Sequence, residues 1–149
     1  MYIKTLLSLF FIFLILIAGI YMTINIVNYF DPFAGCYLNI DGDIVSGNKE
    51  TIKSAIRYLG KTDRTAYRNL CAVVDRVSEK NCIIADQRID SKSFIEGLNL
   101  DGCYVKGTRT IYLRPDKGES QDVIEGRART IKYYTESVSR FWDEYGSKN

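Results

Sequence analysis

The chain has 149 residues, and its 20 Lys and Arg residues against 18 Asp and Glu residues leave a net charge of only +2. It contains no histidine, the commonest general base and metal ligand, which excludes Ser–His and Cys–His nucleophile systems within the chain. Charge is also nearly balanced beyond the apolar N-terminus, with no basic tail, so we expect no nucleic-acid partner.

A membrane-spanning helix is expected near the N-terminus. No charged residue occurs between positions 5 and 30, and thirteen of the twenty residues at 5–24 are Leu, Ile or Phe. Twenty helical residues reach ~30 Å, the thickness of the hydrocarbon core of a bilayer. Insertion of this segment is favourable by about 5 kcal/mol. We therefore expect contact with the lipid bilayer through residues 5–27.

The charges on either side of this span predict its orientation. Lys4 and the terminal amine precede it, whereas Asp31, Asp41 and Asp43 follow it before the next lysine, Lys49. Short flanks with positive charge stay in the cytoplasm. The chain is thus expected to be a single-pass protein of the cell membrane, with a cytoplasmic N-terminus and an extracytoplasmic C-terminal domain.

Four segments follow from this interpretation. They are a cytoplasmic tip with a signal-anchor helix (1–30), a short linker (31–35), one extracytoplasmic domain (36–145) and a C-terminal tail (146–149). The alternative is a lipoprotein, because "DPFAGC" ends in a cysteine, Cys36, that could carry a lipid. Asp31 and Pro32 separate this cysteine from the apolar segment, and Phe33 replaces the usual aliphatic residue, so we favour the signal anchor.

Along the domain, "CYLNIDGDIV" (36–45) is typical of a hairpin around an Asp-Gly turn. Helical periodicity predicts a helix over 48–60, capped by Asn48 and ended by Gly60, and a second over 62–81, capped by Thr62 or Asp63. These helices should form a helical hairpin. A buried strand is expected at 82–86 and a loop at 87–101.

The last third of the chain predicts a second hairpin and a long helix. "GCYVKGTRTIYLRP" (102–115) places β-branched and aromatic residues around a Lys-Gly-Thr turn. Ser120 can cap a helix over 121–144 whose apolar face includes Ile124, Ala128 and Ile131. The expected fold class is α+β: a transmembrane helix, then a small disulfide-bonded domain with a short antiparallel sheet and about three helices.

The four cysteines, Cys36, Cys71, Cys82 and Cys103, all follow the apolar span. No Cys-x-x-Cys pair occurs, which disfavours zinc and redox sites, so no metal or cofactor is expected. Two structural disulfides are the preferred interpretation. If a helix continues to Lys80, a 71–82 bond is barely reachable. Two pairings stay open: 36–71 with 82–103, and 36–82 with 71–103.

One segment resembles a known enzyme scaffold. "GTRTIYL", a polar loop and a helix beginning "DVIEGRARTIKYY" resemble the strand-then-helix order of zincin-type metallopeptidases, whose helix carries HExxH. Glu125 matches the position of the general base, but Ile124 and Ala128 replace both zinc ligands. The resemblance implies an inactive or partner-dependent relative that keeps the scaffold for binding.

Two surfaces are candidates for binding. Lys106, Arg109, Arg114 and Lys117, against Asp116 alone, give the second hairpin a local charge of +3 that suits an anionic glycan or an envelope protein. The final helix concentrates aromatic residues, among them Tyr133, Tyr134 and Trp142, which favour interfaces. Since no catalytic motif is found, the sequence predicts a binding or structural module rather than an enzyme.

Overall fold

The computed structural model describes residues 2–82, 88–91 and 101–146. Its helices and strands follow in the order α1 (Tyr2–Val27), β1 (Tyr29–Asp31), β2 (Cys36–Asp41), α2 (Lys49–Thr62), α3 (Arg64–Val73), β3 (Arg76–Glu79), β4 (Ile89–Ser91), β5 (Gly102–Val105), β6 (Thr110–Leu113) and α4 (Gln121–Tyr145). The α+β class is therefore confirmed, with an apolar helix ahead of a domain whose described residues form three helices.

The strands form one sheet in the order β1-β2-β3-β6-β5-β4. Strand β3 pairs in parallel with β2 on one side and with β6 on the other, while the remaining three ladders are antiparallel. The expectation of a purely antiparallel sheet is therefore wrong. The difference arises at β3, which occupies the centre of the sheet although its sequence predicts helix.

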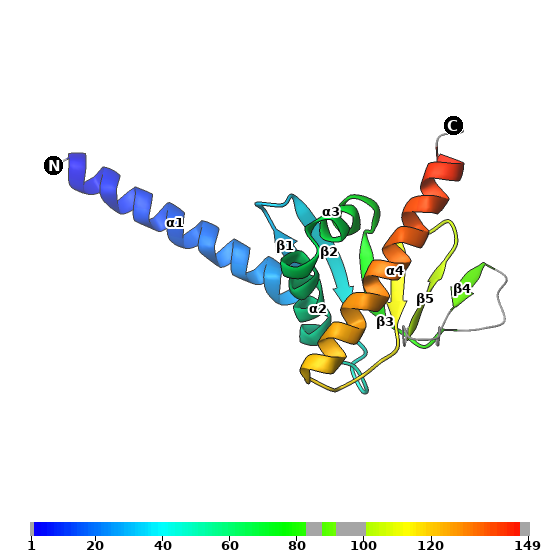
Figure 1. The fold of residues 1–149 in the computed structure, drawn as a ribbon. Helices are drawn as coiled ribbons and strands as arrows, with labels where there is room; N and C mark the ends of the chain where they lie inside the picture. The colour runs from blue at the N-terminus through cyan, green and yellow to red at the C-terminus, as the bar shows by residue number, and fades with distance from the viewer. Residues whose placement is uncertain (1, 83–87, 92–100, 147–149) are drawn as a thin grey trace.

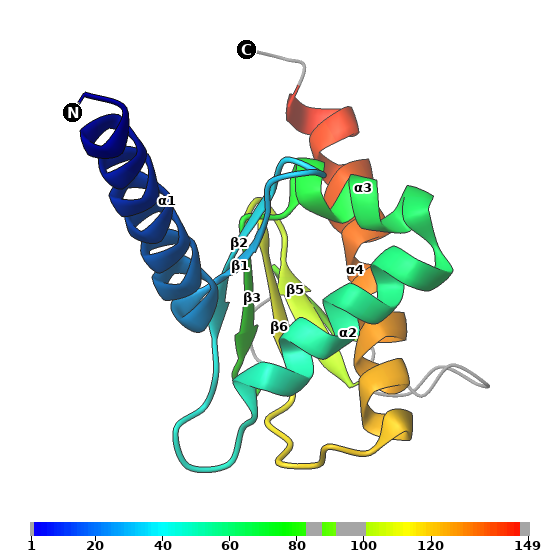
Figure 2. The same cartoon turned by 90° about the vertical axis from the view of Figure 1, so that its left-hand side faces the viewer.

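The molecule has two layers. Helices α2, α3 and α4 cover one face of the sheet, and α1 projects from the opposite side of the domain (Figures 1 and 2). Successive side chains of β2 point to opposite faces of the sheet. Cys36, Leu38 and Ile40 therefore all lie in the core. The core between the layers is built mainly from aliphatic side chains, including Ile52, Ile56, Leu70, Val77, Ile111, Leu113, Ile131 and Val138.

The helical pair α2–α3 is formed much as its caps predict. The Asn48 side chain accepts hydrogen bonds from the amides of Glu50 (3.1 Å) and Thr51 (3.2 Å). Asp63 separates the two helices and caps α3 by accepting from the amide of Ala66 (3.0 Å). Helix α2 continues through Gly60 to Thr62, so this glycine does not end it.

The predicted helix over 62–81 is wrong in its second half. Helix α3 ends at Val73, and Val74 has extended dihedral angles. The amides of Asp75 and Arg76 then donate to the carbonyl of Arg109 (2.9 and 3.2 Å), and Arg76–Glu79 continues as strand β3. Pairing with two neighbouring strands thus overrides the helical spacing of the valines, which also suits a buried strand.

The first hairpin lies earlier than predicted. Strand β2 pairs with β1 across residues 32–35 rather than with a strand after the Asp-Gly turn. Gly35 has a φ of 64°, a conformation that glycine adopts without strain. Asp43 instead accepts from the amides of Val45 and Ser46 (2.9 and 2.7 Å), and this turn leads the chain into α2. The sheet therefore begins at Tyr29, within the segments expected as anchor and linker.

The C-terminal elements agree with the sequence. Strands β5 and β6 form the predicted hairpin, with Gly107 at a φ of 86° in its turn. Ser120 caps α4 by accepting from the amide of Val123 (3.4 Å). Residues 89–91, expected in a loop, form the edge strand β4. The strand expected at 82–86 lies almost entirely outside the described residues.

The structure contains the pairing 36–71 with 82–103. The first disulfide joins β2 to α3, and the second joins the segment after β3 to β5. This is one of the two pairings that the sequence leaves open. The premise of that argument, a helix extending to Lys80, is wrong, because α3 ends two residues after Cys71.

Helix α1 is attached to the domain through a buried lysine. The ammonium group of Lys53 on α2 donates to the carbonyl oxygen of Ile26 (3.0 Å) and to a carboxylate oxygen of Glu50 (2.9 Å). The last carbonyl groups of a helix lack partners within it and carry the negative end of its dipole. Lys53 therefore caps α1 from a different element and holds its end against the domain.

Replacing Cys36 and Cys71 together with alanine should lower the free energy of unfolding by about 2–4 kcal/mol, because their disulfide closes a long loop in the unfolded chain. Denaturant titration of the full chain in detergent micelles measures this loss. The matched Cys82→Ala/Cys103→Ala variant opens a shorter loop, of sequence separation 21 instead of 35, and should lose slightly less. Unchanged stability in the first variant would contradict the pairing.

Candidate functional site at the ends of the parallel strands

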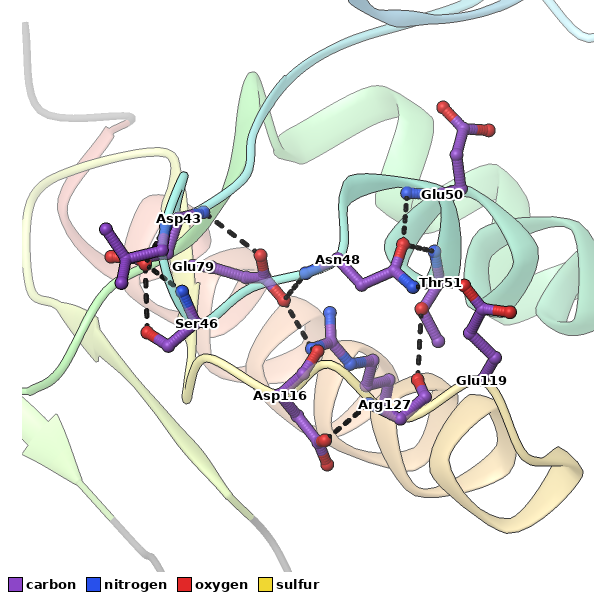
Figure 3. Close-up of polar contacts among 11 residues, drawn as sticks. Asp43, Ser46, Asn48, Glu50, Thr51, Glu79, Asp116, Glu119 and Arg127 are labelled. Atoms are coloured by element: carbon purple, nitrogen blue, oxygen red, sulfur yellow. Dashed lines mark hydrogen bonds and ion pairs between the residues drawn. The ribbon is translucent and has the colours of Figure 1, made fainter.

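Strands β2, β3 and β6 are parallel and end at the same edge of the sheet. Two loops leave from this edge: the β2–α2 loop (residues 42–48) and the β6–α4 loop (residues 114–120). In parallel sheets the crevice outside the carboxyl ends of the strands is the usual place for a ligand. Figure 3 shows the polar side chains that gather there.

A buried carboxylate, Glu79, lies at the base of this edge. One of its oxygens accepts from the amide of Asp43 (3.1 Å), and the other accepts from the amide of Asn48 (3.0 Å). The second oxygen also accepts a short hydrogen bond from the guanidinium group of Arg127 on α4. Both oxygens are thus occupied, and the carboxylate ties the two ends of the β2–α2 loop to the sheet (Figure 3).

The guanidinium group of Arg127 is buried beside this carboxylate. Its Nη2 also donates to the carbonyl oxygen of Asp116 (3.0 Å) in the β6–α4 loop, while Nη1 finds no acceptor among the described residues. Two opposite charges in contact neutralise each other where neither can reach water. The Glu79–Arg127 pair therefore connects the β2–α2 loop to the β6–α4 loop. Both oxygens of the Glu79 carboxylate already accept hydrogen bonds from the Asp43 amide, the Asn48 amide and Arg127.

The two loops are also joined directly. The side-chain amide of Asn48 donates to a carboxylate oxygen of Glu119 (3.0 Å), and the hydroxyl of Thr51 donates to the carbonyl oxygen of Gly118 (3.2 Å). Asn48 thus serves as helix cap and as loop bridge. These contacts fix the start of α2 relative to the start of α4.

Glycine is required at position 47 by the Glu79 carboxylate. A Cβ atom there would lie 1.9 Å from the nearer carboxylate oxygen, much closer than any real contact. The side chain of Asp43 closes the same loop, because it accepts from both backbone and hydroxyl of Ser46 and from the amide of Val45. These hydrogen bonds hold the pKa of the Asp43 carboxyl below its usual value, so their contribution to stability is lost as the pH falls through that lowered pKa.

An open cavity of about 470 Å³ lies against this loop, lined by residues 40–44 and 47–50. Two aliphatic side chains beside it face solvent: Ile44 is 100% exposed and Val45 is 77% exposed. These two side chains are exposed on a loop whose two ends are hydrogen-bonded to Glu79. Sequence reasoning missed this site, because it assigned residues 44–45 to a strand.

The basic residues of the β5–β6 hairpin lie at its two ends. Lys106 and Arg109 flank the turn, where the Arg109 guanidinium lies 5.0 Å from the centre of the Trp142 ring. Arg114 and Lys117 follow β6 at the other end, and Arg114 pairs with Asp101 at 3.6 Å. The structure therefore does not bring the four cations together.

The aromatic residues of α4 differ in how far they are buried. Tyr134 is completely buried and donates to the carbonyl oxygen of Gly102 (3.0 Å), so its place in a binding surface is wrong: the helix turns it into the core. Tyr133 and Trp142 are half-buried and pack against the core, whereas Tyr145 is exposed.

The zincin-like segment shows core packing at its two ligand positions. Ala128 is buried and Ile124 packs against the core. Glu125 accepts a hydrogen bond from the Gln121 side chain (2.9 Å). Within residues 2–82, 88–91 and 101–146, no three His, Cys, Asp or Glu side chains gather as metal ligands. The Cys36 sulfur, the alternative lipid attachment point, is bonded to Cys71.

No family model matches this chain, and neither a curated protein nor a solved structure is significantly similar to it.

Changing Glu79 to Gln should lower the free energy of unfolding by about 3–5 kcal/mol, because the Arg127 charge would stay buried without its counter-charge. Denaturant titration measures this loss, and hydrogen exchange should show faster exchange of the Asp43 and Asn48 amides.

Asp101→Asn is the matched control, since it removes the carboxylate of the exposed Arg114–Asp101 pair. Exposed pairs contribute about 0–1 kcal/mol. An equal loss of unfolding free energy in the two variants would show that the Glu79–Arg127 pair does not connect the two loops.

Proposed function

We propose that this chain is a single-pass membrane protein whose disulfide-bonded domain lies outside the cytoplasm and acts as a binding module. The β2–α2 loop is its recognition surface. The observation that carries the binding role is the fully exposed Ile44, presented on a loop whose two ends are hydrogen-bonded to the buried Glu79.

The membrane location is supported by α1 and by the disulfides together. Residues Leu6–Ile24 form a helix long and apolar enough to cross a bilayer, and the apolar window of this helix contains no buried residue. Both disulfides lie beyond it. Disulfides persist in oxidising compartments, so an apolar anchor followed by such a domain is consistent with a membrane-anchored or secreted protein. The charge difference across the span favours an extracytoplasmic domain.

The binding role is supported by the way the loop is held. Asp43 and Asn48, at its two ends, are fixed by one carboxylate, so little conformational freedom is left to lose when a partner binds. Ile44 and Val45 supply apolar surface, and the adjoining cavity carries the polar groups of Asp41 and Lys49 at its edge. An apolar centre with a polar rim is the usual composition of a protein–protein contact, so we assign a protein partner.

Membrane topology tests the location. In sealed right-side-out vesicles, an added protease should digest the domain and leave the N-terminal end of α1 protected. Maleimide labelling after denaturation should modify no cysteine unless a reductant is added first. Free thiols, or a domain protected from the protease, would place it in the cytoplasm and contradict the proposal.

Site-specific photo-crosslinking in intact cells tests the recognition surface. A photoreactive amino acid at Ile44 should yield one discrete protein adduct, and Val45→Asp in the same chain should abolish it, because a charge would enter an apolar contact. The control position is Tyr145, also exposed but at the far end of α4. No adduct at Ile44, or the same adduct at Tyr145, would argue against this surface.

A further inference from the structure

The β1–β2 hairpin returns toward the membrane side of the domain. Strand β1 begins two residues after α1 ends, and the amide of the intervening Asn28 donates to the carbonyl oxygen of Ile24 (2.8 Å). In both views of the fold the hairpin turn lies toward the end of the molecule where α1 has its N-terminus (Figures 1 and 2). The β2–α2 loop lies at the opposite end, so the two ends of β2 face different surroundings.

Aromatic side chains connect this hairpin to the last turns of α1. The rings of Tyr21 and Phe30 have centroids 5.9 Å apart, and those of Phe30 and Tyr37 are 6.4 Å apart. Tyr21 lies within the final two turns of the helix, where aromatic residues settle at the edge of a bilayer. The hairpin is therefore packed against the part of α1 that is expected at the lipid–water boundary.

The hairpin tip (residues 32–35, Pro-Phe-Ala-Gly) suits a lipid environment. Phe33 is 99% exposed. The amides of Phe33 and Ala34 both donate to a carboxylate oxygen of Asp31 (3.1 and 3.2 Å), and proline has no amide hydrogen. Unsatisfied backbone donors are what makes exposed turns costly in lipid, and Asp31 satisfies two of the three amides of this tip. The other Asp31 oxygen accepts from the Tyr67 hydroxyl (2.8 Å), which turns the carboxylate toward the domain.

Basic side chains line a cleft beside the same tip. Lys53, whose ammonium group holds the end of α1, is followed at four-residue intervals by Arg57 and Lys61, so these side chains follow one face of α2. Arg57, Lys61 and Arg64, which we name the basic face, line a cleft of about 230 Å³ together with Phe33. Asp31 is the only carboxylate in the lining of this cleft, and it accepts three hydrogen bonds as described above.

We propose that the hairpin tip inserts Phe33 into the lipid–water interface beside α1, while the basic face binds the headgroups of anionic phospholipids. This inference rests on the proposed membrane-spanning role of α1. Continuity with that helix and the match of charge favour a lipid surface over a protein. The three cations lie close together in the sequence, and the fold brings them beside Phe33 of the hairpin, 24 or more residues earlier in the chain.

Fluorescence quenching by lipid tests the insertion. The full chain is reconstituted as Phe33→Trp in a Trp142→Phe background, in vesicles of phosphatidylcholine and phosphatidylglycerol in equal parts, with or without bromine on the acyl chains. The matched control is Ile44→Trp in the same background, since Ile44 is equally exposed at the other end of β2. Circular dichroism and intact disulfides establish that each variant is folded.

Brominated lipid should quench most of the emission of the Phe33→Trp variant and shift it to the blue, and should leave the Ile44→Trp variant unchanged. Replacing Arg57, Lys61 and Arg64 with glutamine should reduce the quenching to the level seen in pure phosphatidylcholine. Quenching that never depends on phosphatidylglycerol would overturn the headgroup part of the proposal.

Vesicle flotation separates the remaining outcomes. If the protein floats with the vesicles but the emission of the Phe33→Trp variant is not quenched, the proposed insertion of the hairpin tip is wrong, whereas the proposed membrane anchoring by α1 is retained. Equal quenching of both variants would also overturn it, because the domain would then lie flat on the lipid. If the chain does not float with vesicles, both the proposed membrane anchoring by α1 and the proposed insertion of Phe33 are wrong.

Discussion

Burial of the Glu79 carboxylate constrains how every element around it can be arranged. A charge without solvent needs a compensating charge and hydrogen bonds to nearly all of its lone pairs. The structure meets this need with donors from the β2–α2 loop and from α4. Strand β3, two loops and the longest helix of the domain must therefore reach their places together. The exposed Ile44 lies on the loop whose two ends are hydrogen-bonded to that carboxylate.

A second constraint acts at the other end of the domain, where Lys53 binds the last turn of α1. Because this lysine is buried and on α2, the direction of α1 is coupled to the packing of the helical layer. The Cys36–Cys71 disulfide supports the same region by fixing β2, and with it the hairpin, to α3. The two ends of β2 thus have distinct roles in our proposals: one faces the lipid, and the other presents the recognition loop.

The parts of the fold that the sequence predicts correctly are those encoded locally. The capping side chains of Asn48 and Ser120 predict where α2 and α4 begin, and the turn at Gly107 predicts the β5–β6 hairpin. Strand β3 was not predictable in this way, because Val77 continues the helical spacing of α3 and only its partners in β2 and β6 make it a strand. The candidate site was missed for the same reason. Glu79 and Arg127 are 48 positions apart, and each alone resembles a solvated charge on a helix.

The strand order also determines when the domain can be completed. Strand β3 finds its second neighbour only at Thr110–Leu113, and the guanidinium group for Glu79 follows later still, on α4. A chain that emerges N-terminus first must hold β3 with one edge open and its carboxylate hydrated until the C-terminal third arrives. An open edge is a template for pairing with other chains. Truncation within α4 should therefore leave an aggregation-prone intermediate rather than a smaller stable domain.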